Sequence, residues 1–276
     1  MTTLNDLHSI SSTFSNTDKM PVLFLGHGSP MNAIEENQFV AGFRNLAKTL
    51  PQPNAILCIS AHWFTNGTKV TSMQMPRTIH DFGGFPQALF DVQYPAKGSP
   101  ELALETRKIL DPVHVDLDEH WGLDHGAWSV IKHLYPEANV LVIQLSIDYT
   151  KSGQYHFELA QKLQSLRHKG VLIIGSGNIV HNLRLVDFRN FDKDNYGYDW
   201  AIEARETINN YLLDENFQPL IDFEKMNKAI QLAIPTPDHY LPLLYTLGLK
   251  EKSEELSLFN DKLLAGSLSM TSVKIM

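Results

Sequence analysis

Three histidines in this sequence stand at or shortly beyond the ends of apolar runs that predict buried strands. His27 follows VLFLG, His62 follows AILCISA, and His181 comes shortly after VLIIGSG. In open α/β sheets ligands bind beyond the carboxyl ends of the strands, so imidazoles from neighbouring parallel strands converge on one crevice. Neutral imidazole is a good ligand for Zn²⁺ or Fe²⁺. The pattern therefore predicts a site for one divalent metal ion.

Two further histidines are candidates for the same crevice. His239 lies in TPDHYLPLLY, where Pro237 and Asp238 are typical of a helix start from which the imidazole can project into the crevice. His125 in WGLDHGAW also stands at a predicted helix start, and Gly126 beside it leaves backbone space near a ligand. We take His239 as a fourth candidate ligand and His125 as a candidate acid, base or hydrogen-bond donor.

The other histidines favour ordinary structural roles. A single histidine is commonly a capping, exposed or hydrogen-bonded core residue, and from position alone that alternative stays open for every candidate. His80 and His120 fall in predicted loops that border the site. No role is assigned to the remaining five, which are His8, His114, His133, His156 and His168.

The familiar motifs of other catalytic classes are missing from the sequence. GHGSP lacks the spacing of a phosphate-binding loop, and GSGN has Val180 where the third glycine of a dinucleotide fingerprint is required. Ser29 and Ser176 lie near candidate histidines, but no GxSxG pattern surrounds either of them. Cys58 stands in the middle of a predicted strand, where a small buried side chain is expected. These absences argue against nucleotide binding and serine hydrolysis.

Alternating strands and helices must position the candidate histidines. Apolar runs bounded by Gly, Ser or Asn predict parallel strands at 22–26, 55–61, 140–146 and 171–177. Apolar residues at helical spacing predict helices at 36–49, 100–110, 126–135, 155–169 and 200–213. The segment 76–98 carries too many Pro and Gly residues for one regular element, and 266–276 is rich in β-formers that favour a last strand. The expected fold is a single α/β domain with a central, mostly parallel sheet flanked by helices.

Composition limits the classes of partner. The chain has 276 residues and a formal net charge of −8, which repels phosphate backbones and anionic lipid surfaces, so we expect neither nucleic-acid nor membrane partners. One cysteine permits no internal disulfide and no thiolate zinc site, which favours the cytoplasm. Residues 1–20 are rich in Ser and Thr and predict a flexible tail, followed by one catalytic domain over 21–276.

Six segments, taken in order, resemble a known enzyme family. They are GHGSPMNAIE, ISAHWFT, TIHDFGGFPQALFDVQYPAKG, WGLDHGAWSVIKHLYPEANV, GSGNIVHNLR and TPDHYLPLLYTLG. Together they span most of the chain and are similar to the class III (LigB-type) extradiol ring-cleavage dioxygenases, in particular the bacterial 4,5-DOPA extradiol dioxygenase branch. The resemblance implies a single α/β domain holding a non-haem metal that binds a catechol and O₂. Lys97 in YPAKG departs from the family pattern, where a second Pro is expected.

The resemblance also implies roles for individual residues. His27, His62 and His239 match metal-ligand positions. His181 matches an active-site histidine that serves as acid or base or approaches a resting zinc ion as an additional ligand, and His125 matches a histidine near the substrate. In the loop 76–98, we expect the catechol ring to be enclosed by three aromatic side chains, namely Phe82, Phe85 and Tyr94; simple loop packing is the alternative for them.

Two other function classes stay open on the residues alone. Three histidines also hold zinc in hydrolytic enzymes, so donor types do not separate an Fe(II) dioxygenase from a zinc-dependent hydrolase. A bound zinc ion would be ambiguous, because zinc binds such sites more tightly than Fe²⁺. A non-catalytic small-molecule binding protein is the third possibility. The sequence selects neither the catechol nor the oligomeric state, for which a monomer and a homodimer are both acceptable.

Overall fold

Four parallel strands form the centre of a six-stranded sheet in the computed structural model, which describes residues 14, 15, 17–191 and 193–276. Two antiparallel strands extend the sheet beyond β1 on one side. In spatial order the strands are β6 (Leu141–Gln144), β2 (Ala55–Ser60), β8 (Val171–Gly177), β1 (Val22–Gly26), β12 (Ser272–Ile275) and β9 (Leu256–Phe259). The predicted α/β class with a mostly parallel central sheet is confirmed.

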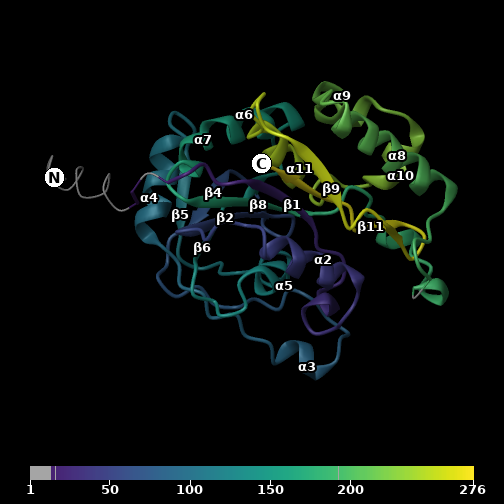
Figure 1. Cartoon of the computed structure of the whole chain (residues 1–276), viewed down its shortest axis with the longest axis horizontal. Coiled ribbons are helices and arrows are strands. Elements are labelled where there is room, and N and C mark those ends of the chain that lie inside the picture. The colour runs from purple at the N-terminus through teal and green to yellow at the C-terminus, as the bar shows by residue number, and fades with distance from the viewer. Residues whose placement is uncertain (1–13, 16, 192) are drawn as a thin grey trace, which may run out of the picture.

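Helices cover both faces of this sheet (Figure 1). On one face lie α2 (Gln38–Ala47) and α5 (His125–Leu134), and on the other lie α6 (Gly153–Lys162), α8 (Asp199–Leu213) and α11 (Leu241–Gly248). Alternate residues of a strand point to opposite faces. Leu23 and Leu25 of β1 accordingly pack with the α2 and α5 side, whereas Val22 and Phe24 pack with the other. Burial on both faces explains why the central strands are continuous apolar runs.

Short elements and loops connect these layers. They are η1 (Pro30–Ala33), β3 (Phe64–Thr65), β4 (Thr68–Thr71), α3 (Gln87–Phe90), α4 (Pro100–Ile109), β5 (Val115–Asp118), β7 (Ile147–Asp148), α7 (Gln164–Arg167), η2 (Leu183–Leu185), η3 (Phe188–Asn190), α9 (Phe217–Ile221), η4 (Phe223–Lys225), α10 (Lys228–Ala233), β10 (Leu263–Leu264) and β11 (Leu268–Ser269). The predicted loop 76–98 is irregular except for the single turn of α3. The predicted last strand is present as β12, paired antiparallel with β1.

The helix predicted over 155–169 is wrong in its extent. The structure has α6, which begins at Gly153, and the separate short helix α7. Between them the backbone tightens, because the amide of Leu163 bonds the carbonyl of Ala160, three residues back. This turn keeps Leu163 and Leu166 fully buried in the core. The periodicity of apolar residues thus continues across a break that it cannot reveal.

Residues 17–20 lie against the body of the protein, although the sequence predicts them as part of a flexible tail. The amide of Thr17 donates to the carbonyl of His168 at 2.8 Å, and the amide of Met20 donates to that of Arg167 at 3.0 Å. Lys19 forms an ion pair with Glu254 at 3.0 Å. The remainder of the predicted tail, residues 1–13 and 16, lies outside the described residues.

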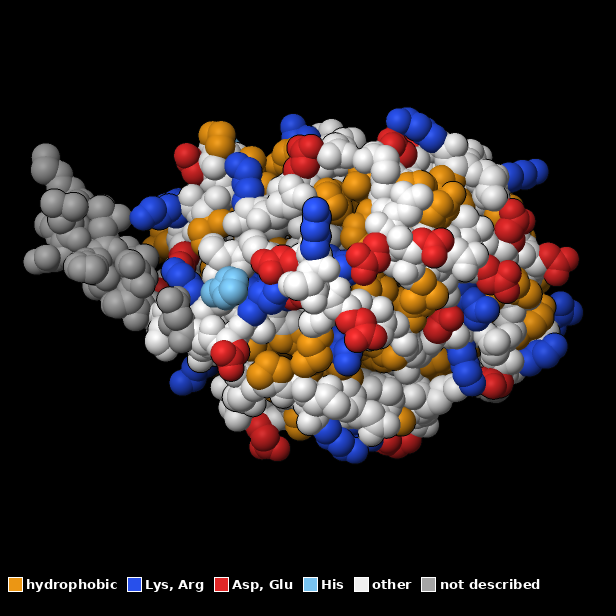
Figure 2. Space-filling view, turned by 45° about the horizontal axis from the view of Figure 1, so that its top comes forward, with side chains coloured by type: hydrophobic (Ala, Val, Ile, Leu, Met, Phe, Trp, Pro, Cys, Tyr) orange, Lys and Arg blue, Asp and Glu red, His pale blue; other side chains and the backbone are white. Residues whose placement is uncertain are grey.

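Acidic and basic side chains are interspersed over the face drawn in Figure 2, with small apolar areas between them. Neither sign of charge dominates this face. Among the described helices, none has the length and apolar character needed to cross a membrane.

Candidate metal centre

His27 and His62 leave the sheet at the same edge, from the two strands that flank β8. His27 follows β1 directly, and its amide donates to the carbonyl of Gly177 at the end of β8 at 3.2 Å. His62 stands two residues beyond β2, and the preceding amide, of Ala61, donates to the carbonyl of Ser176 at 3.0 Å. Because β1 and β2 run parallel to β8, both imidazoles emerge at the carboxyl end of the sheet.

His239 reaches this edge from the loop before α11. Its carbonyl accepts a hydrogen bond from the amide of Asn178 at 2.9 Å, so its backbone crosses the end of β8. Gly177 permits this crossing, because a Cβ atom there would overlap the carbonyl oxygen of His239. His181, four residues beyond β8, stacks on His239 with ring centroids 3.5 Å apart and an interplanar angle of 9°. The sequence predicts that His239 projects from the start of a helix. In the structure His239 instead precedes the helix, which begins at Leu241.

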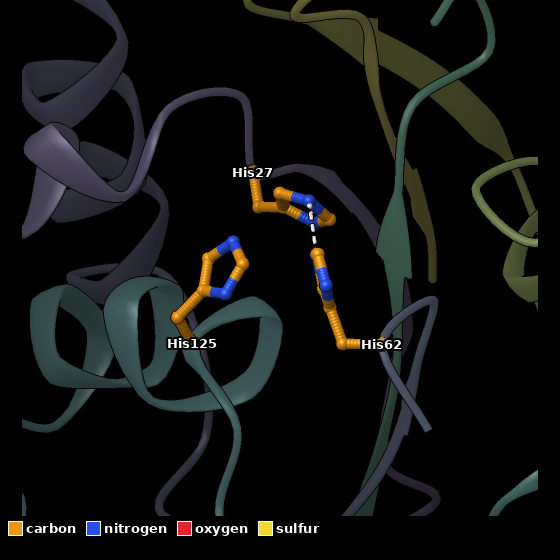
Figure 3. A group of neighbouring side chains, drawn as sticks. All are labelled: His27, His62 and His125. Atoms are coloured by element: carbon orange, nitrogen blue, oxygen red, sulfur yellow. Dashed lines mark hydrogen bonds between the residues drawn. The ribbon is translucent and has the colours of Figure 1, made fainter. Parts of the chain in front are cut away.

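The rings of His27, His62 and His239 form a nearly equilateral triangle. Their centroids are separated by 5.0 Å for His27 and His62, 5.2 Å for His27 and His239, and 5.0 Å for His62 and His239. Figure 3 shows His27 and His62 with His125 beside them. The Nε2 atoms of His27 and His62 are 3.2 Å apart.

Oxygen atoms beside Nδ1 set the tautomer of each ring in this triangle. The hydroxyl of Ser176 donates to the carbonyl of Gly126 at 2.5 Å, so it must accept from Nδ1 of His27, which lies 3.0 Å away. Nδ1 of His62 lies 3.3 Å from a carboxylate oxygen of Asp81. Nδ1 of His239 bonds a carboxylate oxygen of Asp238. Each Nδ1 therefore carries the proton, and each Nε2 presents a lone pair.

This donor set fits a divalent cation. Two lone pairs that face each other at 3.2 Å repel unless a positive charge lies between them, and the spacing suits two bonds of about 2.1 Å to one ion. Burial, reinforced by the neighbouring imidazoles, holds the pKa values of His27 and His62 well below the usual 6.5. Neutral imidazoles are the form that ligates metals. Carboxylate or hydroxyl partners on Nδ1 are also the usual outer support of metal-bound histidine.

His125, the first residue of α5, lies beside the triangle. Its ring centroid is 3.9 Å from that of His62, and Nδ1 lies 3.0 Å from the second carboxylate oxygen of Asp81, which also accepts the backbone amide of His125 at 2.9 Å. One ring nitrogen from each of His27, His62 and His125 lies within 4.8 Å of the other two, so by proximity these three also form a candidate ligand set. Gly126 makes the approach possible, because a Cβ there would lie 2.7 Å from Cδ2 of His62.

The five histidines line one cavity of about 630 Å³. Phe82 and Phe85, two of the three aromatic residues named on the loop 76–98, also line this cavity. The remaining lining comes from Gly28, Ser29, Pro30, Met31, Glu35, Asp81, Leu183, Val186, Phe188, Phe191 and Leu268.

Tyr94 lies elsewhere, contrary to the expected aromatic wall. It is 1% exposed, and its hydroxyl donates to the carbonyl of Tyr135 at 2.8 Å. Burial raises the pKa of its phenol well above the usual 10. The side chain packs in the core beneath the loop, so the alternative of simple loop packing describes it better.

The comparisons with known proteins place the chain in a family. Residues 21–267 match the family described as the catalytic LigB subunit of aromatic ring-opening dioxygenase. The chain belongs to the LigB family. It is therefore an extradiol aromatic ring-opening dioxygenase, and LigB-type dioxygenases use a metal.

Several relatives align over nearly their whole length with this LigB chain. It is 46% identical over 270 residues to the 4,5-DOPA dioxygenase extradiol of Escherichia coli K12, covering 96% of this chain and 98% of that protein. It is 34% identical to a protein of the same name from Beta vulgaris, covering 91% and 94% of the two chains. The crystal structure of an uncharacterized Escherichia coli K12 protein superposes with a TM-score of 0.81 at 42% identity, covering 94% of this chain and all of that one.

Asp81, Ser176 and Asp238 are the LigB site residues whose roles sequence reasoning missed. Asp81 and Asp238 each adjoin a histidine in sequence, but Asp81 contacts His62 and His125 rather than its neighbour His80. His80 instead bonds the carbonyl of Val92 at 2.9 Å. An acidic residue next to a candidate ligand was the available signal for Asp238, whereas nothing in the sequence links Asp81 to His62.

Proposed function

We propose that this LigB chain is an Fe(II)-dependent dioxygenase that opens a catechol ring with O₂ on the extradiol side, and that His27, His62 and His239 hold the metal. The observation that carries the ligand assignment is the triangle of imidazole rings with centroids 5.0 to 5.2 Å apart, each with a carboxylate or hydroxyl oxygen beside its Nδ1. Three neutral ligands leave the ion its full charge and leave coordination positions free for substrate.

His125 rather than His239 is the proton-handling residue in this proposal. The carboxylate of Asp81 lies next to both Nδ1 and the backbone amide of His125, so it holds this imidazole in position at the cavity. His125 therefore accepts a proton from a catechol hydroxyl and returns it later in the reaction. When bound, the metal lowers the pKa of that hydroxyl and, as iron, supplies the electrons that activate O₂.

His181 is proposed as the second acid or base. It lines the cavity and stacks on His239, and burial together with the His239 ring lowers its pKa to about 3. It is therefore neutral near pH 7 and able to accept a hydrogen bond from the substrate. Its role as an additional ligand of a resting zinc form stays a prediction.

Phe82 and Phe85 are proposed to enclose the aromatic ring. Both line the cavity, and their rings meet edge to face with centroids 5.5 Å apart. Phe82 also lies edge to face with His125 at 5.5 Å. An aromatic substrate placed between these rings and the histidines would be shielded from water, which strengthens the electrostatic interactions around it. The partners are then a small catechol and O₂; cytoplasmic location stays a prediction from the sequence.

The function is tested by reconstitution. Metal-free protein is loaded anaerobically with Fe²⁺ or with Zn²⁺ and exposed in air to a panel of catechols that includes DOPA. Iron-dependent oxygen uptake with a yellow ring-opened product supports the proposal. If the iron form shows no oxygen uptake with any catechol and the zinc form hydrolyses esters or amides, the zinc hydrolase alternative would replace this proposal.

The ligand set has its own test, because His125 is the rival of His239. We expect His27→Ala, His62→Ala and His239→Ala each to lose metal, measured by elemental analysis after dialysis. His125→Ala should keep the metal and lose turnover. Full occupancy in His239→Ala with loss in His125→Ala would reassign the third ligand to His125.

A further inference from the structure

Two buried serines join the edge of the sheet to the start of α5. Ser60 ends β2, and its partner in the parallel register is Ser176 of β8. The hydroxyl of Ser60 donates a hydrogen bond of 2.5 Å to a carboxylate oxygen of Asp124. The hydroxyl of Ser176 donates one of the same length to the carbonyl of Gly126. The helix is therefore bonded to two neighbouring strands through the residues on either side of His125.

Asp124 transmits the contact with Ser60 to the backbone of α5. Its side chain is fully buried, and the oxygen that accepts from Ser60 also accepts the amide of Ala127 at 3.1 Å, which caps the helix. The other oxygen accepts Nε1 of Trp121 at 3.2 Å. A buried carboxylate with three donors is held in one position, and the helix that it caps begins at a fixed place. The first residue of that helix is His125.

Ser60 makes this contact without touching a ring of the metal triangle. Its hydroxyl lies 3.3 Å from the backbone amide of His62, whereas the hydroxyl of Ser176 accepts from Nδ1 of His27 at 3.0 Å. Neither Ser60 nor Asp124 belongs to the described lining of the cavity. The two serines thus resemble each other in their contact with α5 and differ in their contact with the candidate metal ligands.

We infer that Ser60 is a positioning residue that acts through Asp124 to fix His125 beside the metal triangle. The inference rests on the proposed function, because it takes His125 as the residue that moves the proton. An acid or base must lie within hydrogen-bond reach of the atom that it serves, and a displacement of about 1 Å can cost about 100-fold in rate. Loss of the Ser60 hydroxyl leaves the cap from Asp124 to Ala127 in place, so the fold is retained while His125 becomes free to shift.

Kinetics and metal binding of Ser60→Ala test this inference on the full chain, with a catechol that the native protein opens. We expect kcat of the iron-loaded variant to fall about 10- to 100-fold, while KM and the metal affinity stay within about twofold of the native values. Ser176→Ala should instead lose about 10- to 100-fold in metal affinity, measured by competition with a chelator, because Nδ1 of His27 loses its acceptor. A loss of metal affinity in Ser60→Ala as large as that in Ser176→Ala would overturn the inference, since the hydroxyl would then support a ligand.

The matched control is Ser129→Ala. Ser129 is a buried serine of the same helix, and its hydroxyl has no hydrogen-bond partner within the described part of the chain. Removal of this hydroxyl should leave kcat, KM and metal affinity within about twofold of the native values. A fall in kcat in Ser129→Ala equal to that in Ser60→Ala would overturn the inference, because the contact with Asp124 would then not be its cause.

The position of His125 is measured without turnover, in crystal structures of the zinc-loaded native chain and of zinc-loaded Ser60→Ala. The ring centroids of His62 and His125 are 3.9 Å apart, and we expect this distance to change by at least about 0.5 Å in the variant. An unmoved His125 ring or an unchanged kcat would overturn the inference and leave the dioxygenase function standing. If the native chain opens no catechol, the proposed function fails, whereas the two crystal structures still decide whether Ser60 positions His125.

Discussion

Asp81 connects two histidines of the site, so its replacement by Asn gives a sharp test of the hydrogen-bond reasoning. One carboxylate oxygen lies 3.3 Å from Nδ1 of His62. The other lies 3.0 Å from Nδ1 of His125 and accepts a hydrogen bond from the backbone amide of His125 at 2.9 Å. Asn keeps one acceptor oxygen, which the backbone amide of His125 holds in place. Its NH₂ group then faces the protonated Nδ1 of His62, and two donors oppose each other.

The magnitude of this change follows from the loss of support for His62. To escape the donor–donor contact, its ring must move or shift its proton to Nε2, which removes the lone pair directed at the metal. Loss of such an outer partner costs about 10- to 100-fold in metal affinity, or about 1.4 to 2.8 kcal/mol. Turnover should fall further than occupancy explains, because His125 also loses the carboxylate that holds its ring in position at the cavity.

Metal affinity of Asp81→Asn is measured by competition with a chromophoric chelator, and kcat is then determined at saturating Fe²⁺. The matched control is Asp91→Asn, an exposed carboxylate of the same loop whose partner is Gln87 at 2.9 Å. We expect the control to match the unaltered protein within about twofold. Metal affinity and kcat of Asp81→Asn that both stay within the same twofold range would refute the assignment of Nδ1 protons on which the metal centre depends.

Three further predictions concern packing and stability. Tyr94→Phe should leave kcat/KM intact and lower the free energy of unfolding in urea by about 1 kcal/mol, because the carbonyl of Tyr135 loses one of its two hydrogen bonds. A loss of activity at full stability would return Tyr94 to the site. Gly126→Ala should lower metal occupancy and activity, because the added methyl carbon would lie 2.7 Å from Cδ2 of His62; a crystal structure with the His62 ring unmoved would contradict this. Burial alone would raise the pKa of Glu254, but its hydrogen bonds to the guanidinium of Arg167 outweigh burial and lower this pKa from 4.5 to about 2. The carboxylate therefore stabilises the fold by up to about 3 kcal/mol above pH 4.5. This contribution is lost as the pH falls towards 2. The difference in unfolding free energy between the native chain and Glu254→Gln should therefore shrink over that interval, and a difference independent of pH would contradict the shift.

The sheet and the position of its functional edge were predictable because both depend on local patterns. Continuous apolar runs place β1 and β8 with the observed bounds, and parallel strands necessarily bring the residues that follow them to one edge. The break between α6 and α7 was not predictable, because Leu163 and Leu166 keep the helical spacing while the backbone hydrogen bonds change. The prediction that Tyr94 lines the cavity was wrong for a related reason. An aromatic residue in a Pro-rich loop can equally well line a cavity or pack in the core.

What separates the histidines of the site from buried histidines of the core is the use of the second ring nitrogen, which no sequence pattern reports. His133 is as buried as His125, yet its Nε2 bonds the carbonyl of Asn32 at 2.7 Å. This ring nitrogen therefore stabilises the backbone and is not free to bind a ligand. His156, to which the sequence assigns no role, is fully buried and bonds the hydroxyl of Tyr245 at 3.0 Å. His27 differs because Ser176 occupies Nδ1 and a second imidazole faces Nε2. Histidines of equal burial thus diverge in function through partners distant in sequence, and those partners exist only once the strands have been brought side by side.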